Sequence, residues 1–161
     1  MKRLCKRWGT VSLFLMLLLS PFYLMAQFCL PLNSMNLTSG FGWRKHPVTG
    51  NKDFHSGVDL SARFEAVFAI VDGRITAQGF HPNLGKFIRL ESNGLEIVYG
   101  HLSISVVADG QDVRSGDYLG LSGQTGRVTG PHLHLSTKFR GSPINPLRFL
   151  IGLACNQYSY N

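Results

Sequence analysis

The stretch Pro131-His132-Leu133-His134-Leu135 decides how this sequence is interpreted. Side chains alternate along a β-strand, so His132 and His134 would project from one face while the two leucines enter a core. A second stretch, His55-Ser56-Gly57-Val58-Asp59, places a histidine and a carboxylate four residues apart, where they would again share a face. Two histidines and one carboxylate that converge can bind zinc and leave one coordination position open, which is the ligand count of a hydrolytic site.

Three further histidines complete the six in the chain. His101 ends a predicted central strand, Leu95–His101, and strengthens the metal-site interpretation because one His-x-His pair alone is a weak signal. His46 and His81 each precede a proline, so both are interpreted as structural loop residues.

Other catalytic chemistries fit the sequence less well. There is neither a His-Glu-x-x-His helix nor a Gly-x-Ser-x-Gly elbow. The segment from Gly79 to Lys86 has the wrong glycine spacing for a phosphate loop, and Phe87 stands where that motif needs a hydroxyl residue. The glycine-rich segment Gly123–Gly130 opens no helix and is predicted as a turn that leads into the His132 strand.

Short apolar runs separated by turn residues predict one all-β domain, without internal repeats or a second domain. Ser92-Asn93-Gly94 predicts a hairpin turn and Arg140-Gly141-Ser142-Pro143 a second turn. Asn145 followed by Pro146 predicts a helix N-cap, with one or two helical turns to about Leu150. The candidate strands are Met35–Leu37, Gly57–Leu60, Ala66–Ile70, Arg74–Gly79, Lys86–Glu91, Leu95–His101, Tyr118–Leu121 and His132–Phe139.

The N-terminus has the layout of a secretory signal peptide. Basic residues precede an apolar run from Val11 to Met25, and Ala26 offers a small residue for cleavage. A retained membrane anchor is the alternative, but Pro21 interrupts the run, which is shorter than the ~20 residues of a spanning helix. We therefore expect residues 1–26 to be removed and the protein to act in the periplasm, the cell envelope or outside the cell.

Charge and cysteine usage agree with export. Without the four basic residues of 1–26, 12 of the 16 basic residues remain against nine acidic ones, a net charge of +3. A weakly cationic exported protein suits an anionic envelope polymer, and the scattered basic residues carry no nucleic-acid-binding motif. Cys29 and Cys155 also remain, which predicts a disulfide; two unpaired thiols or zinc ligands are the alternatives.

These motifs together resemble the lysostaphin-type zinc metallopeptidases, which cut peptide cross-links in bacterial peptidoglycan. The resemblance runs from about Leu37 to Leu150, with the motifs in the family's order and spacing. The sequence departs from the family pattern at Phe64-Glu65-Ala66, where Gly-x-Pro is common, and at Leu135-Ser136, where Phe-Glu is usual. The matching stretches are Thr38-Ser39-Gly40-Phe41-Gly42-Trp43-Arg44, His55-Ser56-Gly57-Val58-Asp59-Leu60, Ala69-Ile70-Val71-Asp72-Gly73, Tyr99-Gly100-His101-Leu102-Ser103, Thr129-Gly130-Pro131-His132-Leu133-His134 and Asn145-Pro146.

The resemblance implies a compact, sandwich-like antiparallel β-domain (the family's duplicated hybrid motif) with a narrow groove. It implies one zinc per chain, bound by His55, Asp59 and His134. His101 and His132 would be the catalytic pair, one as general base and the other as stabiliser of the carbonyl oxygen, in an order that the sequence leaves open.

The expected function is therefore that of an exported, monomeric zinc endopeptidase acting on peptidoglycan peptides, without a nucleic-acid partner or a permanent membrane anchor. We expect a signal peptide at 1–26, a lead-in at 27–34, a catalytic domain at 35–151 and a tail at 152–161. Two alternatives stay open: a non-catalytic relative that binds the wall or activates another hydrolase, and a carbohydrate-binding module with an incidental metal. The second needs an exposed aromatic platform, which the sequence does not clearly show.

Overall fold

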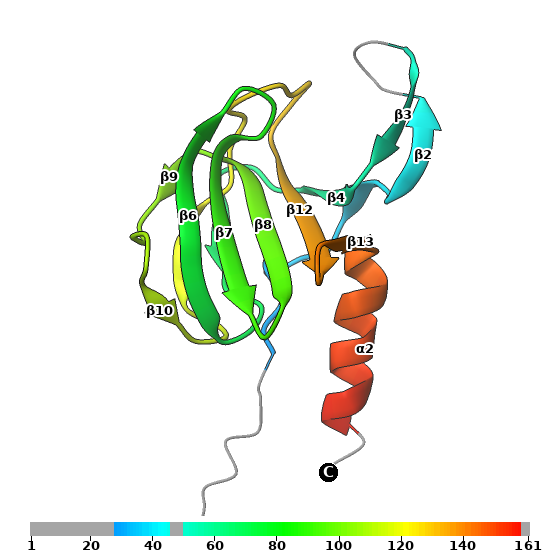
Figure 1. Cartoon of the computed structure of the whole chain (residues 1–161). Coiled ribbons are helices and arrows are strands. Elements are labelled where there is room, and N and C mark those ends of the chain that lie inside the picture. Colours follow the sequence, from blue (N-terminus) through cyan, green and yellow to red (C-terminus); the bar gives the residue numbers. More distant parts are fainter. Residues whose placement is uncertain (1–27, 46–49, 159–161) are drawn as a thin grey trace, which may run out of the picture.

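The computed structural model describes residues 28–45 and 50–158, which form antiparallel β-structure followed by one helix (Figure 1). The predicted signal peptide and His46 lie outside the described residues. Within the described part of the chain, no helix is long and apolar enough to cross a membrane.

The main sheet holds the segments on which the candidate site depends. A separate three-stranded sheet and a two-stranded hairpin complete the β-structure. The strands of the main sheet are, in spatial order, β1 (Leu37–Ser39), β4 (Gly57–Ser61), β12 (His132–Phe139), β8 (Leu95–Leu102), β7 (Gly85–Ser92), β6 (Gly73–His81) and β10 (Asp112–Val113), with β13 (Ser142–Ile144) also paired to β12. The three-stranded sheet has the order β5 (Ala66–Phe68), β11 (Tyr118–Leu121) and β9 (Ile104–Ser105), and the hairpin pairs β2 (Gly42–Lys45) with β3 (Lys52–His55).

The predicted alternation along β12 is confirmed. Leu133 and Leu135 are fully buried in the core, and so are Val58 and Leu60 on the neighbouring strand β4. Tyr99 of β8 is the largest fully buried side chain of the described residues, and its hydroxyl oxygen accepts a hydrogen bond from the Ile70 N–H at 3.0 Å. One face of β4, β12 and β8 therefore packs the core, which leaves the other face for polar side chains.

Both predicted turns are present. Asn93 and Gly94 have φ angles of 50° and 80° and connect β7 to β8 in a two-residue turn, as Asn-Gly sequences favour. Arg140 and Gly141 make the second two-residue turn, between β12 and β13. This turn is shorter than predicted, because Ser142 already pairs with Phe139 in the sheet.

Helix α2 (Pro146–Tyr158) begins as predicted but is longer. The Asn145 Oδ1 accepts a hydrogen bond from the Leu147 N–H at 3.0 Å, so Asn145 is the N-cap and Pro146 the first helical residue. The expected end near Leu150 is wrong, because Leu153 also packs against the core one helical turn later. Residues 152–158 are thus helical, although the sequence predicted the start of a tail there.

The structure does not contain the predicted Cys29–Cys155 disulfide. The Cys29 Sγ donates a hydrogen bond to the Leu30 carbonyl at 3.4 Å, and Cys29 is half-buried ahead of β1. Cys155 lies on α2, whose course the sequence did not predict beyond Leu150, and its side chain is exposed.

Phe64, where the sequence departs from the family pattern, has a backbone conformation that suits glycine. Its φ angle is 54°, in the left-handed region that glycine adopts most easily. The exposed Phe64 lies in the turn before β5, at the position where the Gly-x-Pro expected from the resemblance would place glycine.

Candidate functional site

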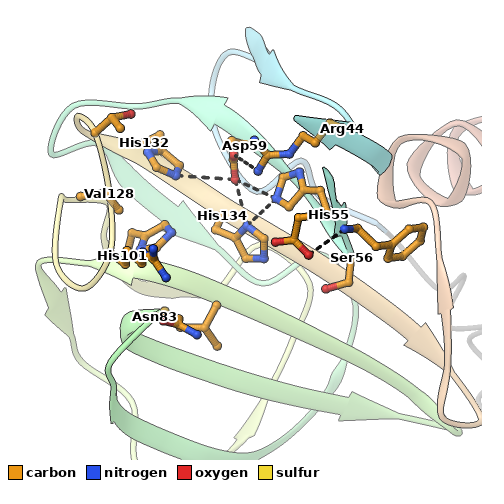
Figure 2. A pocket seen from close by; sticks show the side chains of 14 residues that line it. Arg44, His55, Ser56, Asp59, Asn83, His101, Val128, His132 and His134 are labelled. Atoms are coloured by element: carbon orange, nitrogen blue, oxygen red, sulfur yellow. Dashed lines mark hydrogen bonds and ion pairs between the residues drawn. The ribbon is translucent and has the colours of Figure 1, made fainter. Parts of the chain in front are cut away.

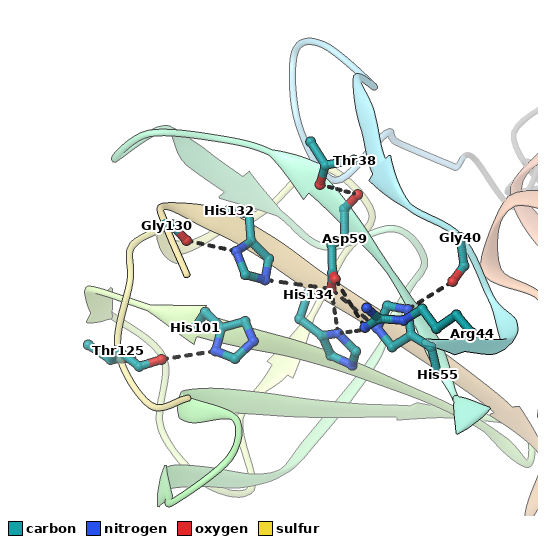
Figure 3. Close-up of polar contacts among 10 residues, drawn as sticks. All are labelled: Thr38, Gly40, Arg44, His55, Asp59, His101, Thr125, Gly130, His132 and His134. Carbon is teal, nitrogen blue, oxygen red and sulfur yellow. Dashed lines mark hydrogen bonds and ion pairs between the residues drawn. The ribbon is translucent and has the colours of Figure 1, made fainter. Parts of the chain in front are cut away.

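Asp59 is the centre of the candidate site. It pairs with His134 across β4 and β12, on the polar face of the sheet (Figure 3). The Asp59 Oδ1 lies 2.9 Å from the His134 Nδ1 and 3.3 Å from the His55 Nε2, and these two nitrogen atoms are 3.2 Å apart. The structure therefore brings together the three residues for which the sequence predicted a shared metal.

His55 reaches this group from a different strand than expected. The chain leaves β3 at His55 and enters β4 at Gly57, so His55 and Asp59 converge without sharing one continuous strand. The His55 ring is held by the Gly40 carbonyl, 2.9 Å from its Nδ1. Since a carbonyl only accepts, Nδ1 carries the proton and the lone pair of Nε2 faces Asp59.

Gly57 leaves room for this convergence. A Cβ atom at Gly57 would lie 2.6 Å from the Leu135 carbonyl oxygen and 2.7 Å from the His134 Cε1. Both distances are below any normal contact, so a side chain at Gly57 would displace either the neighbouring strand or the His134 ring.

The donor set fits a zinc ion. Bonds of ~2.0–2.1 Å in tetrahedral geometry place two ligand atoms about 3.3 Å apart. The separations of 2.9, 3.2 and 3.3 Å between Asp59 Oδ1, His134 Nδ1 and His55 Nε2 lie close to that value. Two imidazoles and one carboxylate are also a donor combination that zinc accepts.

His132 lies beside this group on the same strand as His134. Its Nδ1 donates to the Gly130 carbonyl at 2.9 Å, and its Nε2 is 3.6 Å from the Asp59 Oδ1 (Figure 3). The Gly130 carbonyl therefore orients the ring so that Nε2 points into the site.

His101 enters the site through a β-bulge. Between the pairs Ile88–Tyr99 and Lys86–Leu102, two residues of β8 oppose one residue of β7. His101 is one of the two, and its φ angle of 60° is unusual for a residue other than glycine. The bulge aims the imidazole at the polar face, 4.6 Å from the His132 ring and 5.7 Å from the His134 ring between centroids. Such local strain is typical of functional sites.

Two main-chain carbonyls hold His101 in this conformation. The Leu84 carbonyl accepts the His101 backbone N–H at 2.6 Å. The Thr125 carbonyl accepts the ring Nδ1–H at 2.9 Å, which leaves the Nε2 lone pair for the site.

The surroundings keep the Asp59 carboxyl ionised and favour the neutral forms of His101 and His134. Burial alone raises the pKa of Asp59, but the adjacent imidazoles of His134 and His55 outweigh it and hold that pKa well below its usual range. Burial lowers the pKa of His101 to about 4 and also lowers the pKa of His134. Metal binding requires this combination of an anionic carboxylate and neutral imidazoles.

One pocket of about 290 Å³ is lined by all five candidate residues, which are His55, Asp59, His101, His132 and His134 (Figure 2). Sequence reasoning assigned no role to Arg44 of β2, whose Nη2 lies 3.7 Å from the Asp59 Oδ2. Arg44 stands in a recognised motif, but only the tertiary contact reveals its partner. The other lining residues are Asp53, Phe54, Ser56, Asn83, Leu84, Arg127, Val128 and Thr129.

His81 has the structural role that the sequence predicted. It is exposed at the end of β6, and its Nδ1 accepts hydrogen bonds from the N–H groups of Asn83 and Leu84 at 3.2 and 3.4 Å. It thus supports the turn that carries the Leu84 carbonyl to His101. The glycine-rich segment before β12 behaves as predicted and makes a turn, in which Gly126 approaches the Gly85 backbone too closely to admit a Cβ atom.

Curated relatives share this part of the sequence. The DD-carboxypeptidase/endopeptidase Mpg of Neisseria meningitidis serogroup B is 40% identical over 119 residues, which are 73% of this chain and 27% of the relative. The peptidoglycan DD-endopeptidase ShyB of Vibrio cholerae is 38% identical over 115 residues, which are 70% of this chain and 27% of the relative. The matches thus span about a quarter of the length of these two relatives.

Solved structures share the fold. A zinc-containing peptidase from Vibrio cholerae matches with a TM-score of 0.69 at 36% identity, over 74% of this chain and 39% of that one. The catalytic domain of the antimicrobial peptidase lysostaphin from Staphylococcus simulans matches with a TM-score of 0.65 at 31% identity, over 72% of this chain and 92% of that one. The predicted lysostaphin-type antiparallel β-fold is confirmed. Residues 53–146, more than half of the chain, match Peptidase family M23, and the chain belongs to that family.

Proposed function

We propose that this protein is an exported zinc-dependent endopeptidase that hydrolyses peptide bonds in the stem or cross-bridge of bacterial peptidoglycan. The observation that carries the proposal is the convergence of three donor atoms, from His55, Asp59 and His134, beside two further histidines in one pocket. The similarity to two DD-endopeptidases supports the reaction class, and the name of one of them supports the substrate. The basic and then apolar N-terminus supports export.

In this proposal, His55 Nε2, His134 Nδ1 and an Asp59 carboxylate oxygen hold the zinc. Zinc there supplies Lewis acidity, which makes a water molecule easier to deprotonate and a carbonyl carbon easier to attack. Arg44 pairs with the other oxygen of Asp59, so that one oxygen stays directed at the two imidazoles. The carboxylate is then held from both sides, by a guanidinium and by the ligand set.

His101 is the proposed general base. With a pKa of about 4 it is neutral at pH 7, and its proton is on Nδ1, where the Thr125 carbonyl accepts it. The Nε2 lone pair is thus the only free polar atom of the ring, and it can accept the proton of the attacking water. The resulting imidazolium can later deliver that proton to the leaving amine.

His132 is the proposed stabiliser of the substrate carbonyl oxygen. Its Nε2 points into the same pocket, beside the proposed metal ligands and 3.6 Å from the Asp59 Oδ1. An N–H held toward the reacting carbonyl stabilises the charge that develops on its oxygen.

The test combines metal analysis with product analysis. Purified protein is assayed for zinc by mass spectrometry and then incubated with defined cross-linked muropeptides, whose products are weighed. We expect one zinc per chain and products that differ from the substrate by one water. Zinc-loaded, folded protein that leaves all muropeptides intact would contradict the proposed activity and favour a non-catalytic wall-binding role. Export is checked by N-terminal sequencing of protein from the cell envelope, which should begin at Gln27.

A further inference from the structure

A cluster of aromatic residues projects from the β2–β3 hairpin without a role in the core. The Trp43 side chain is 69% exposed, the largest value among the exposed large hydrophobic residues of the described chain. Phe54 lies directly opposite Trp43 in the hairpin, 37% exposed, with ring centroids 5.5 Å apart in an edge-on arrangement. Phe41 packs edge-on against Phe54 at 5.1 Å and connects the cluster to the core.

The two faces of the hairpin carry different chemistry. Arg44 pairs with Asp53 on one face, and from that face Arg44 reaches Asp59 in the candidate metal site. Trp43 and Phe54 are the adjacent pair and therefore belong to the opposite face. Phe54 also lines the pocket, whereas Trp43 does not, so Phe54 is the residue that connects the aromatic face to the candidate active site.

A cation completes this face. The Lys52 Nζ lies 5.6 Å from the centroid of the Trp43 ring, within the range of a cation–π contact. The face therefore offers two aromatic rings and an ammonium group whose protons are available to a ligand. Figure 1 shows that β2 and β3 stand apart from the main sheet, beyond β4, so a long ligand can contact the hairpin and the pocket together.

We propose that Trp43, Phe54 and Lys52 form a sugar-binding subsite, which takes an N-acetylated sugar of the glycan strand whose peptide enters the pocket. A pyranose ring has one apolar face of C–H groups and a rim of hydroxyl and acetamide groups. The C–H face packs on an aromatic ring, and the rim accepts hydrogen bonds from an ammonium group. An exposed tryptophan beside a lysine fits these requirements better than it fits a peptide of small residues.

The proposal rests on the proposed function, because peptidoglycan joins such sugars to the peptide that would be cut. Continuity between Phe54 and the pocket is the reason for choosing the substrate's own glycan over another protein as the occupant. The subsite would thereby direct the enzyme to peptides that are still attached to the glycan strand.

The binding test needs no catalytic activity. The full chain contains two tryptophans, Trp8 and Trp43, so a Trp8→Phe chain reports on Trp43 alone. Titration with a tetramer of N-acetylglucosamine should give a saturable change in tryptophan fluorescence. Calorimetric titration should show binding weakened roughly tenfold or more in Trp43→Ala and less in Trp43→Phe, which keeps an aromatic ring.

Phe139→Ala is the matched control. Phe139 is a 45% exposed aromatic residue with the Arg140 guanidinium 5.3 Å from its ring, but it lies at the opposite end of β12 from His132. This variant should bind the tetramer like the wild type. Absence of saturable binding to the wild type, or equal loss in Trp43→Ala and Phe139→Ala, would overturn the subsite.

A kinetic comparison connects the subsite to the reaction. Trp43→Ala should lower kcat/KM for glycan-attached muropeptides roughly tenfold more than for the same cross-linked peptides without sugars. An equal decrease for both substrates would overturn the proposal, because it would indicate a role in the peptide site or the fold. If the wild type cleaves neither substrate, the proposed function fails while the tetramer titration still decides the subsite.

Discussion

The Nδ1 of His101 lies 2.9 Å from the backbone oxygen of Thr125, and this contact determines which nitrogen of His101 faces the pocket. The Thr125 side chain secures the contact. Its Oγ1 accepts the Lys86 N–H at 2.8 Å and donates to the Leu102 carbonyl at 2.7 Å, and these two residues pair across the bulge that contains His101. Thr125 is therefore a positioning residue for His101.

Thr125→Val should impair catalysis without removing the metal. Valine has nearly the same shape but lacks the hydroxyl, so the N–H of Lys86 and the carbonyl of Leu102 lose their partner. We expect kcat to fall by about 10–100-fold, since a small misplacement of a catalytic group has effects of this order. Thr125→Ser keeps the hydroxyl and should stay close to the wild-type rate. Steady-state hydrolysis of muropeptides with parallel zinc analysis checks both variants, and a wild-type rate for Thr125→Val would contradict the positioning role.

His55→Ala, Asp59→Ala and His134→Ala should each lose zinc. Every one of these variants removes a donor atom from a set of three, and Asp59→Ala also removes the only anionic ligand. Zinc retained after dialysis against a mild chelator is the measurement. His81→Ala is the control, because His81 is exposed and only supports a neighbouring turn. Stoichiometric zinc in His134→Ala would show that the ligand assignment is wrong.

His101→Ala and His132→Ala should retain zinc and fold but lose turnover. Neither residue belongs to the proposed ligand set, and general acid–base groups contribute about 10²–10⁴-fold to the rate. Zinc content and hydrolysis rates measured on the same samples separate catalysts from ligands. Loss of zinc in His132→Ala would instead exchange the roles of His132 and His134.

Gly57→Ala should destabilise the protein and weaken the metal site. The new methyl group would meet the Leu135 carbonyl oxygen at 2.6 Å and the His134 ring at 2.7 Å, so β12 or the ring must move. We expect a loss of about 1–3 kcal/mol in the free energy of unfolding, as is typical of overpacked sites. Gly152→Ala is the control, since a Cβ atom on this helical residue has no neighbour within 4 Å and alanine favours helix. Urea denaturation of both variants is the check, and equal midpoints for Gly57→Ala and wild type would refute the close approach.

The metal-free protein should lose stability as the pH falls from about 6.5 to about 4. The pKa of His101 is about 4 in the folded protein, against 6.5 for an unperturbed histidine, so the unfolded chain binds this proton first. Proton uptake by the unfolded state lowers the free energy of unfolding in that window, and His134, whose pKa is also lowered, acts in the same direction. Asp59 acts at lower pH, because its folded pKa lies below its unfolded value of 3.8. In His101→Asn, the free energy of unfolding from urea denaturation should change less between pH 6.5 and 4 than in the wild type. An equal change in both proteins would contradict the lowered pKa.

Sequence alone was sufficient wherever the structure depends on local alternation or local turn chemistry. The strand His132–Phe139 follows from polar and apolar residues that alternate, and its buried leucines confirm it. The turn at Asn93 follows from the ease with which Asn-Gly adopts positive φ angles, and the N-cap at Asn145 from its side-chain oxygen. These features involve residues close together in the chain, so no distant partner had to be known.

Tertiary structure decided how the candidate site is assembled. His101 points into the pocket only because β7 and β8 pair with a bulge, and the register of two strands is not encoded in either strand alone. His55 joins Asp59 across a break between β3 and β4, and Arg44 meets Asp59 from a hairpin that the sequence did not predict. The length of α2 depends on the core surface against which Leu153 packs. In each case the deciding contact depends on how separate strands, or the helix and the core, pack together, so only the folded structure determines it.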